Sequence, residues 1–486
     1  MTNRPLREKA GFALMLSTML LAQGHAASSL LYGVDAGIGE TDNVTLVRDN
    51  KINQTIAIAD ADFSYRQQSR LLDADARGNF TFLDYLQGAY GSQFIGRFDG
   101  LGKFSIIPGR LVWELQDSFG QQQIDPFSAL TPNNQEHVNY VSTGPELSLR
   151  LGYTGFINAS VHYARVNYET SPSDSNRFQG SLGIGRQMSA SSSLSIEGSG
   201  ERVLFDNRYV NGVLTNVDYT RSSVFAHYEL SGARNSLLMN LGATIADQEG
   251  RKTTGPLVRV SLARKLSAAA TLTLTGERDV TDASTSFAGL QGGGAATLNA
   301  GTPITGLPQN GIATTPAAQA TNNYTIDYLN GAWNYSRNRT SLTAQANFEK
   351  DDYSGAPQLN LHRFTASISL DRKMTQALTG QLSTSVYRTS YTNTSFAETD
   401  WMATAALIYR IGRGLELKMR YDHASRATSG IATTGTYGAN RLFFTVGYRP
   451  RDRTELPLNL RGSPDVLGAP VRQAIPLGTE GQQPID

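Results

Sequence analysis

Apolar and polar side chains alternate with a period of two along most of this sequence. Within residues 72–82, the even positions from Leu72 to Phe82 are apolar or small, whereas the odd positions, including Asp73 and Arg77, are polar. Alternation of this kind places the two sets on opposite faces of a β-strand. The alternating segments run for about 10 to 14 residues, which is typical of strands that cross a membrane rather than of soluble sheets. The pattern therefore predicts long strands, each with an apolar and a polar face.

The connections between these segments are alternately short and long. The short ones fall at 66–70, 108–109, 153–156, 187–192, 231–236, 265–269, 336–340, 373–377 and 411–415. The long ones fall at 41–53, 83–95, 121–145, 170–176, 206–216, 283–322, 352–359, 392–398 and 426–439. Outer-membrane barrels have short periplasmic turns and longer external loops, an order that a soluble sandwich has no reason to follow. We therefore predict an all-β, transmembrane antiparallel up-and-down β-barrel of about 20 strands, with 18 as the alternative.

Aromatic residues gather near the predicted strand ends. They are Phe80, Phe82, Trp113, Phe119, Tyr163, Tyr168, Tyr391, Trp401 and Tyr448. Amphipathic rings favour membrane interfaces, so we interpret these residues as two aromatic girdles, although β-propensity alone explains part of the set. The last predicted strand, RLFFTVGYR (441–449), resembles the aromatic-ended final strand of outer-membrane proteins.

The two ends of the chain differ from its middle. Residues 1–26 combine a basic start, a short apolar run and small residues before Ala26, which indicates a secretory signal cut after Ala26. No later run reaches the roughly 18 apolar residues of a membrane helix. We expect the barrel to occupy 27–449, with both termini in the periplasm. Residues 450–486 are rich in Pro, Gly and Arg without periodicity, and we expect a disordered periplasmic tail there.

Composition narrows the classes of function. The chain has no cysteine, which excludes disulfides and thiolate metal sites. It carries 43 Lys and Arg against 42 Asp and Glu, and this near-neutral balance argues against nucleic-acid binding. The predicted partner is outer-membrane lipid, and the predicted location is the outer membrane of a Gram-negative bacterium.

The segment SFGQQQIDPFSALTPNNQEHVNYVSTGP (118–145) interrupts the strand pattern. It lies between a predicted strand with Trp113 facing lipid and Glu114 facing the lumen, and another that begins near residue 146. Because short and long connections alternate between the two sides of the membrane, the segment 121–145 is predicted to be extracellular. Three prolines stiffen this segment. Two alternatives stay open, namely that it folds inward and narrows the mouth, or that it lies over the rim.

Three segments carry a family resemblance, namely 37–44 (GIGETDNV), 113–152 and 166–198. They resemble outer-membrane β-barrels of putative porin type that are associated with exopolysaccharide and PEP-CTERM sorting systems. The resemblance implies an outer-membrane location and, by association, a role in surface-polysaccharide export, with polysaccharide or polysaccharide-export machinery as the partner. It supplies no catalytic residue. The candidate motif of the external loop consists of Gln116, Asp117, Asp125, Pro126, Pro132, Asn133, Asn139, Gly144 and Pro145.

We find no pattern that favours an enzyme, and we predict no cofactor. Asp422 and His423 are strand neighbours that point to opposite faces, so they cannot form a catalytic dyad. His162 shares a predicted lumen face with Asn158 and Ser160, which is the ordinary setting of a polar residue in a wet barrel.

Two aspartate-rich strands, DADF (60–63) and DADA (73–76), invite a calcium site because hard oxygens recur in them. We interpret them instead as a mixed-charge patch in the periplasmic half of the lumen, with Asp60 opposite Arg77 and Asp62 opposite Asp75. The residues of this patch are Asp60, Asp62, Asp73, Asp75 and Arg77. We predict no metal site.

The segment 283–322 has no charged residue and is rich in Gly, Ala and Thr. We expect an external loop there, and insertion into the barrel as a plug is the alternative. Three functions remain: a conduit or accessory barrel for surface exopolysaccharide, a diffusion porin whose lumen has few fixed charges, and a structural barrel with partner-binding external loops.

Overall fold

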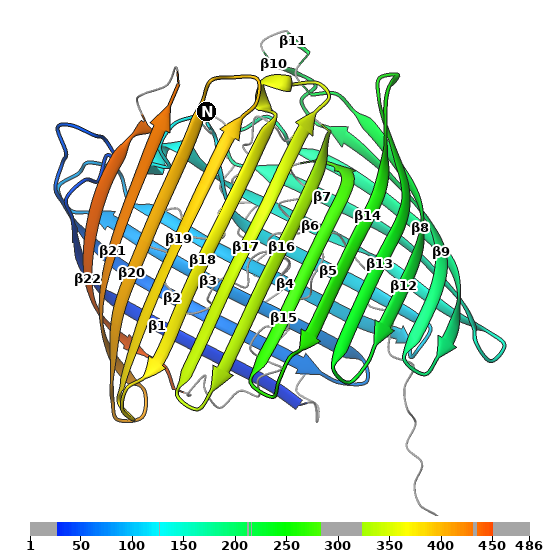
Figure 1. Ribbon diagram of the computed structural model, residues 1–486, viewed down its shortest axis with the longest axis horizontal. Coiled ribbons are helices and arrows are strands. Elements are labelled where there is room, and N and C mark those ends of the chain that lie inside the picture. Colours follow the sequence, from blue (N-terminus) through cyan, green and yellow to red (C-terminus); the bar gives the residue numbers. More distant parts are fainter. Residues whose placement is uncertain are drawn as a thin grey trace, which may run out of the picture.

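The computed structural model describes residues 27–125, 127–210, 213–214, 216–282, 323–430 and 435–450. The predicted signal, the segment 283–322 and the tail beyond 450 lie outside the described residues. Twenty long strands form one closed antiparallel sheet (Figure 1), which confirms the predicted up-and-down barrel and excludes the alternative of 18 strands.

The barrel strands follow one another around the wall in chain order. In the first half they are β1 (Ala27–Thr41), β2 (Gln54–Gln68), β3 (Leu72–Tyr85), β4 (Gln93–Ile107), β5 (Leu111–Gln123), β6 (Gln135–Leu151), β7 (Gly155–Tyr168), β8 (Ser175–Ser189), β9 (Ser192–Phe205) and β12 (Tyr219–Ser231). In the second half they are β13 (Asn235–Gln248), β14 (Arg251–Lys265), β15 (Ala270–Thr281), β16 (Tyr324–Arg337), β17 (Thr340–Tyr353), β18 (Leu361–Lys373), β19 (Leu378–Tyr391), β20 (Ala397–Ile411), β21 (Leu415–Ser429) and β22 (Tyr437–Tyr448). Short elements lie in the loops: β10 (Tyr209–Val210) pairs with β11 (Val213–Leu214), and η1 (Pro132–Asn134) and η3 (Pro357–Leu359) are single turns.

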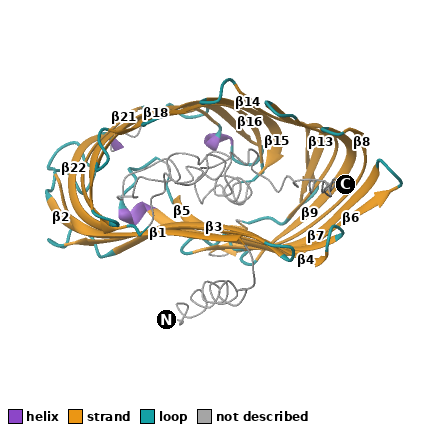
Figure 2. Ribbon diagram, turned by 90° about the horizontal axis from the view of Figure 1, so that it is seen from below, coloured by secondary structure: helices purple, strands orange, loops and turns teal. Residues whose placement is uncertain are grey.

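The barrel closes where the first strand meets the last. β1 pairs with β22 from Val34 opposite Tyr448 to Thr41 opposite Arg441. Closure leaves no free sheet edge, and the wall encloses an oval interior when viewed along the barrel axis (Figure 2).

The predicted order of short and long connections is confirmed, with one exception. At the end of the barrel where β1 begins and β22 ends, the connections are 69–71, 108–110, 152–154, 190–191, 232–234, 266–269, 338–339, 374–377 and 412–414. The other end carries the longer loops, but β13 and β14 are joined there by Glu249 and Gly250 alone. Both residues have positive φ, 50° and 84°, as a two-residue type I′ turn requires. The sequence analysis missed this turn because Glu-Gly is not among the usual signals for it.

The outer surface of the wall is apolar. Large hydrophobic side chains on the outward parity of their strands are exposed, among them Val34, Phe82, Ile184, Leu241, Leu382 and Val446. Seven of the nine predicted girdle residues have this outward parity. Tyr168 and Tyr391 are the exceptions, since they face the lumen and are only 5% and 3% exposed; the girdle prediction is wrong for these two.

Among the described residues, no helix is long and apolar enough to span a membrane.

Candidate functional site

The loop between β5 and β6 folds into the barrel. Its described part is shorter than the predicted 121–145, because β5 continues to Gln123 and β6 begins at Gln135. We call residues 124–134 the constriction segment. The Asp125 carboxylate accepts hydrogen bonds from the Phe127 N–H at 3.0 Å and from the Ser128 hydroxyl, which is the side-chain-capped turn expected for Asp in a loop.

Asn134 closes the base of the constriction segment. Its amide nitrogen donates to the carbonyl oxygens of Asp125 at 2.8 Å and Ala129 at 3.0 Å, and its side-chain oxygen accepts from the Asp125 N–H at 2.8 Å. These bonds satisfy backbone groups that would otherwise be costly to carry into the interior. The segment is therefore a preformed turn rather than a slack loop.

The tip of the constriction segment packs on the far wall of the barrel. The Phe127 ring lies 4.9 Å from the ring of Tyr391 in β19 and 5.3 Å from that of Phe396, in an edge-on arrangement with the latter. Arg426 of β21 donates to the Ser128 carbonyl oxygen at 2.6 Å. Because β19 lies in the front wall of the barrel and β5 in the back wall (Figure 1), the segment crosses the lumen. Of the two alternatives left open by the sequence, the inward one is correct.

The part of the lumen wall formed by β8, β9 and β12 holds a buried charge network, which we call the anchor cluster. Its residues are Arg177, Glu201, Tyr219, Arg221 and Asp282. Arg177 forms ion pairs with Asp282 at 2.7 Å and with Glu201 at 3.0 Å, and Arg221 pairs with Glu201 at 2.6 Å. Tyr219 donates to Asp282 at 2.6 Å. The cluster ties β8, β9 and β12 to the point where the chain leaves β15.

A second network, the seam cluster, lies where the barrel closes. Arg449, which follows β22, pairs with Asp35 of β1, with Asp62 of β2 at 3.2 Å and with Glu416 of β21 at 3.0 Å. Together with the anchor cluster, it shows that the lumen wall carries many fixed charges. The prediction of a lumen with few fixed charges is therefore wrong, and the reason is that strand parity turns most charged residues inward.

The residues of the predicted mixed-charge patch lie in a different register from the one expected. Asp60 lies opposite Thr81 and accepts a hydrogen bond from its hydroxyl, and Asp62 lies opposite Asn79. The expected pairs of Asp60 with Arg77 and of Asp62 with Asp75 therefore do not occur. The turn is the reason, since β2 continues to Gln68 before the chain reverses. Asp75 pairs with Arg77 at 3.1 Å on their own strand, Asp73 lies opposite Gln68, and Asp62 joins the seam cluster instead.

The nine predicted loop-motif residues divide between loop and wall. Asp125, Pro132 and Asn133 belong to the constriction segment, and Pro126 lies outside the described residues. Gln116 and Asp117 lie in β5, whereas Asn139, Gly144 and Pro145 lie in β6. Asn139 donates to the Asp117 carboxylate at 2.7 Å, so this pair ties β5 to β6.

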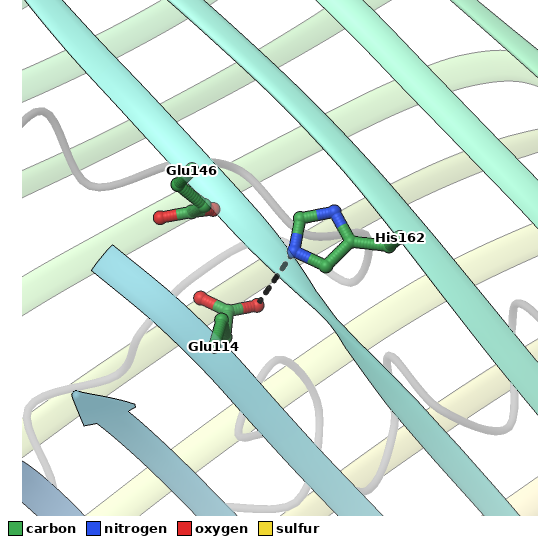
Figure 3. Close-up of side chains that lie close together, drawn as sticks. All are labelled: Glu114, Glu146 and His162. Carbon is green, nitrogen blue, oxygen red and sulfur yellow. Dashed lines mark ion pairs between the residues drawn. The ribbon is translucent and has the colours of Figure 1, made fainter. Parts of the chain in front are cut away.

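A compact cluster of potential metal ligands lies on the wall formed by β4 to β7. Glu114, Glu146 and His162 converge on one point of the lumen face (Figure 3), and one potential ligand atom from each lies within 4.8 Å of the others. The Lys103 ammonium lies 3.0 Å from Glu114 and 3.6 Å from Glu146. Strand parity had placed Glu114 and His162 on the lumen face, but their proximity depends on pairing registers that the sequence does not state.

The other histidine considered in the sequence behaves as predicted. Asp422 is fully buried on the lumen face, where Arg420 binds it at 2.9 Å, while the His423 ring packs against the outward Trp401 at 5.2 Å. The two side chains point to opposite sides of β21, which excludes a dyad between them.

No family model matches the sequence, and comparison with curated proteins finds no match. Among solved structures, the barrel is similar to a mutant of the ferric enterobactin receptor PfeA from Pseudomonas aeruginosa, at 9% identity and a TM-score of 0.42 over 88% of this chain and 81% of that one. It is also similar to the FrpB iron transporter from Neisseria meningitidis, at 8% identity and a TM-score of 0.43 over 86% and 82%. Pseudomonas aeruginosa OpdK with vanillate matches at 10% identity and a TM-score of 0.36 over 87% and 98%. At these values the similarities carry no argument about substrate, and the barrel fold rests on its own strand pairing.

Proposed function

We propose that this chain is a porin-like conduit in the outer membrane of a Gram-negative bacterium, and that the constriction segment narrows its passage for polar solutes. The observation that carries the proposal is the contact of Phe127 with Tyr391 and Phe396 on the opposite wall. A loop held across the interior of a barrel of this strand number restricts what passes without filling the barrel.

The placement in a membrane is supported by the outward face. Its exposed aliphatic and aromatic side chains form a surface that water would disfavour and lipid would accept. The end with the short turns, where β1 begins and β22 ends, then corresponds to the periplasm, and the end with the longer loops to the outside.

The passage suits polar solutes of low net charge. The charges of the lumen wall are largely matched in ion pairs, as in the anchor and seam clusters, so neither sign of ion is favoured throughout. Half-buried polar side chains on the lumen face add hydrogen-bonding groups between the charges, for example Ser148, Asn158 and Gln345. Hydroxyl-rich molecules such as sugars can exchange hydrogen bonds with such a wall.

The finer version of the proposal is that the solute is a surface exopolysaccharide, as the family resemblance implies. In that version the partners are the polymer and its export machinery, and the chain has no catalytic role. Deletion of the gene distinguishes a conduit for exopolysaccharide from a conduit for other polar solutes. Loss of surface polymer with accumulation in the periplasm would support export, whereas unchanged polymer in both compartments would refute it.

The conduit itself is tested with the purified full-length barrel in planar bilayers. We expect steady single-channel conductance that neutral sugars reduce as they occupy the passage. Absence of conductance from folded, inserted protein would contradict the conduit and favour a closed structural barrel whose external loops bind a partner.

A further inference from the structure

We propose that Glu114, Glu146 and His162 form a binding site for a divalent transition-metal ion in the lumen wall, and that the Lys103 ammonium occupies the cation position when no metal is bound. The site is separate from the constriction segment, and the proposal does not depend on what the barrel conducts.

The first observation is the set of ligand types. One imidazole and two carboxylates are the donors that Zn²⁺ accepts in proteins, and the imidazole favours a transition metal over Ca²⁺ or Mg²⁺. The three ligand atoms lie within 4.8 Å of one another, whereas the ligands of one Zn²⁺ ion lie about 3.4 Å apart, as bond lengths near 2.1 Å imply. Small rotations of the three side chains would bring their ligand atoms to the shorter separation.

The second observation is the state of the His162 ring. The residue is 7% exposed, and its Nε2 atom makes no hydrogen bond to any described residue. That atom points at Glu114, 3.8 Å from Oε1 (Figure 3), which is too long for a hydrogen bond. A buried imidazole nitrogen without a hydrogen bond carries a free-energy penalty that a metal ion would remove.

A glycine in the backbone of β6 leaves room for the side chains of Glu114 and His162 to approach each other. Gly144 of β6 lies opposite Glu114 of β5. The pairing of β6 with β7 is interrupted at Gly144 and Pro145, beside His162. A Cβ atom at Gly144 would lie 1.9 Å from the Val161 carbonyl oxygen and 2.8 Å from the His162 Cα atom. Glycine at this position therefore leaves no side chain between Glu114 and His162.

Lys103 gives the metal-free site its neutralising charge. The buried carboxylate of Glu114 and the half-buried carboxylate of Glu146 repel each other, and the ammonium lies 3.0 Å from Glu114 and 3.6 Å from Glu146. A divalent ion supplies more charge and also uses the His162 nitrogen, which the ammonium leaves without a partner. Metal binding should therefore displace Lys103, and the two cations compete for the same carboxylates.

The test is calorimetric titration of Zn²⁺ into folded, tag-free, full-length protein in detergent micelles, with His162→Gln, Glu146→Gln and Lys103→Met. His227→Gln is the matched control, because His227 is also a buried lumen histidine but its Nδ1 is engaged by Asn240 at 2.6 Å. We expect one Zn²⁺ per chain, at least about tenfold weaker binding in the first two variants, and unchanged binding in the control. Lys103→Met should bind at least about tenfold more tightly, since it removes the competing cation.

A spectroscopic readout identifies the ligand directly. Cu²⁺ bound at the site should show nitrogen hyperfine structure in its electron paramagnetic resonance spectrum, and His162→Gln should lose it while His227→Gln keeps it. Heat-modifiable gel mobility confirms that each variant is folded. The proposal is overturned if the wild-type protein binds no Zn²⁺, if His162→Gln leaves affinity and hyperfine structure unchanged, or if Lys103→Met does not bind more tightly.

Discussion

Arg177 is a fully buried arginine that two acidic side chains hold. Its side chain and that of Asp282 are both fully buried, and their 2.7 Å ion pair lies inside the anchor cluster. Removing one partner of a buried pair leaves the other charge without compensation, which typically destabilises a protein by about 3–5 kcal/mol. We therefore expect Arg177→Met to lower the free energy of unfolding by that amount, measured by urea-induced unfolding of the barrel in lipid vesicles.

Arg77→Met provides the matched control. Arg77 also pairs with an aspartate, Asp75, at 3.1 Å, but the two side chains are 49% and 38% exposed. Exposed pairs contribute only about 0–1 kcal/mol. Equal effects of the two substitutions would contradict the view that the anchor cluster is a desolvated network.

The same cluster makes a prediction about pH. Asp282 lies just beyond β15, outside the spanning strands; burial alone raises the pKa of its carboxyl, but the Arg177 guanidinium overrides burial and holds that pKa below its usual range. A carboxylate with a lower pKa in the folded state contributes stability above its unfolded pKa of about 4, and loses it as the pH falls towards the folded value. The stability difference between wild type and Asp282→Asn should therefore be complete at neutral pH and shrink below about pH 4. A difference that stays constant across this range would contradict the assignment.

At the scale of elements, the sequence predicts strands far better than it predicts their pairing. Alternation and loop length indicated about 20 strands and every connection except the two-residue turn between β13 and β14, because both are local signals. The register of β2 on β3 was displaced by four positions, since Asp60 meets Thr81 and not Arg77. Runs such as DADF and DADA alternate equally well in several registers, and only the position of the turn selects one.

The candidate sites depend on contacts that no local pattern encodes. Phe127 meets Tyr391 across the whole interior, and neither residue has a sequence signal that names the other. Likewise, strand parity places Glu114 and His162 on the lumen face, but two successive registers, β5 on β6 and β6 on β7, decide that they converge. Gly144, included among the candidate motif residues, proves to be the position that opens the space between them.

The constriction segment can be tested by releasing its tip. Phe127→Ala removes the ring that packs on Tyr391 and Phe396, a loss on the order of 3 kcal/mol for a large aromatic side chain. The tip should then leave the far wall more often, and single-channel conductance in planar bilayers should rise, with larger current fluctuations.

Phe82→Ala is the control for this experiment, because Phe82 faces outward and is 46% exposed. It should leave conductance unchanged. If Phe127→Ala folds and conducts like wild type, the segment does not limit the passage, and the restriction must lie elsewhere in the lumen.

The whole molecule has two surfaces with opposite chemistry. The outward face exposes aliphatic and aromatic side chains, while the inward face holds the charge clusters and the potential metal ligands. A soluble barrel would have the reverse arrangement, with apolar residues inside and charges outside. The division of the side chains between the two faces therefore indicates which solvent each face meets.

This division leads to a prediction that depends on depth in the membrane. Leu241, in the middle of β13, is 45% exposed on the outward face, and Met188, near the short turn that ends β8, is 60% exposed on the same face. An arginine at the bilayer midplane costs about 2–4 kcal/mol in a barrel, falling to about 0–1 kcal/mol near the interface. Leu241→Arg should therefore destabilise the barrel in phospholipid vesicles by the larger amount and Met188→Arg by the smaller, as measured by urea titration. In water the two arginines would be equivalent, so equal and small effects would show that the outward face does not lie in lipid.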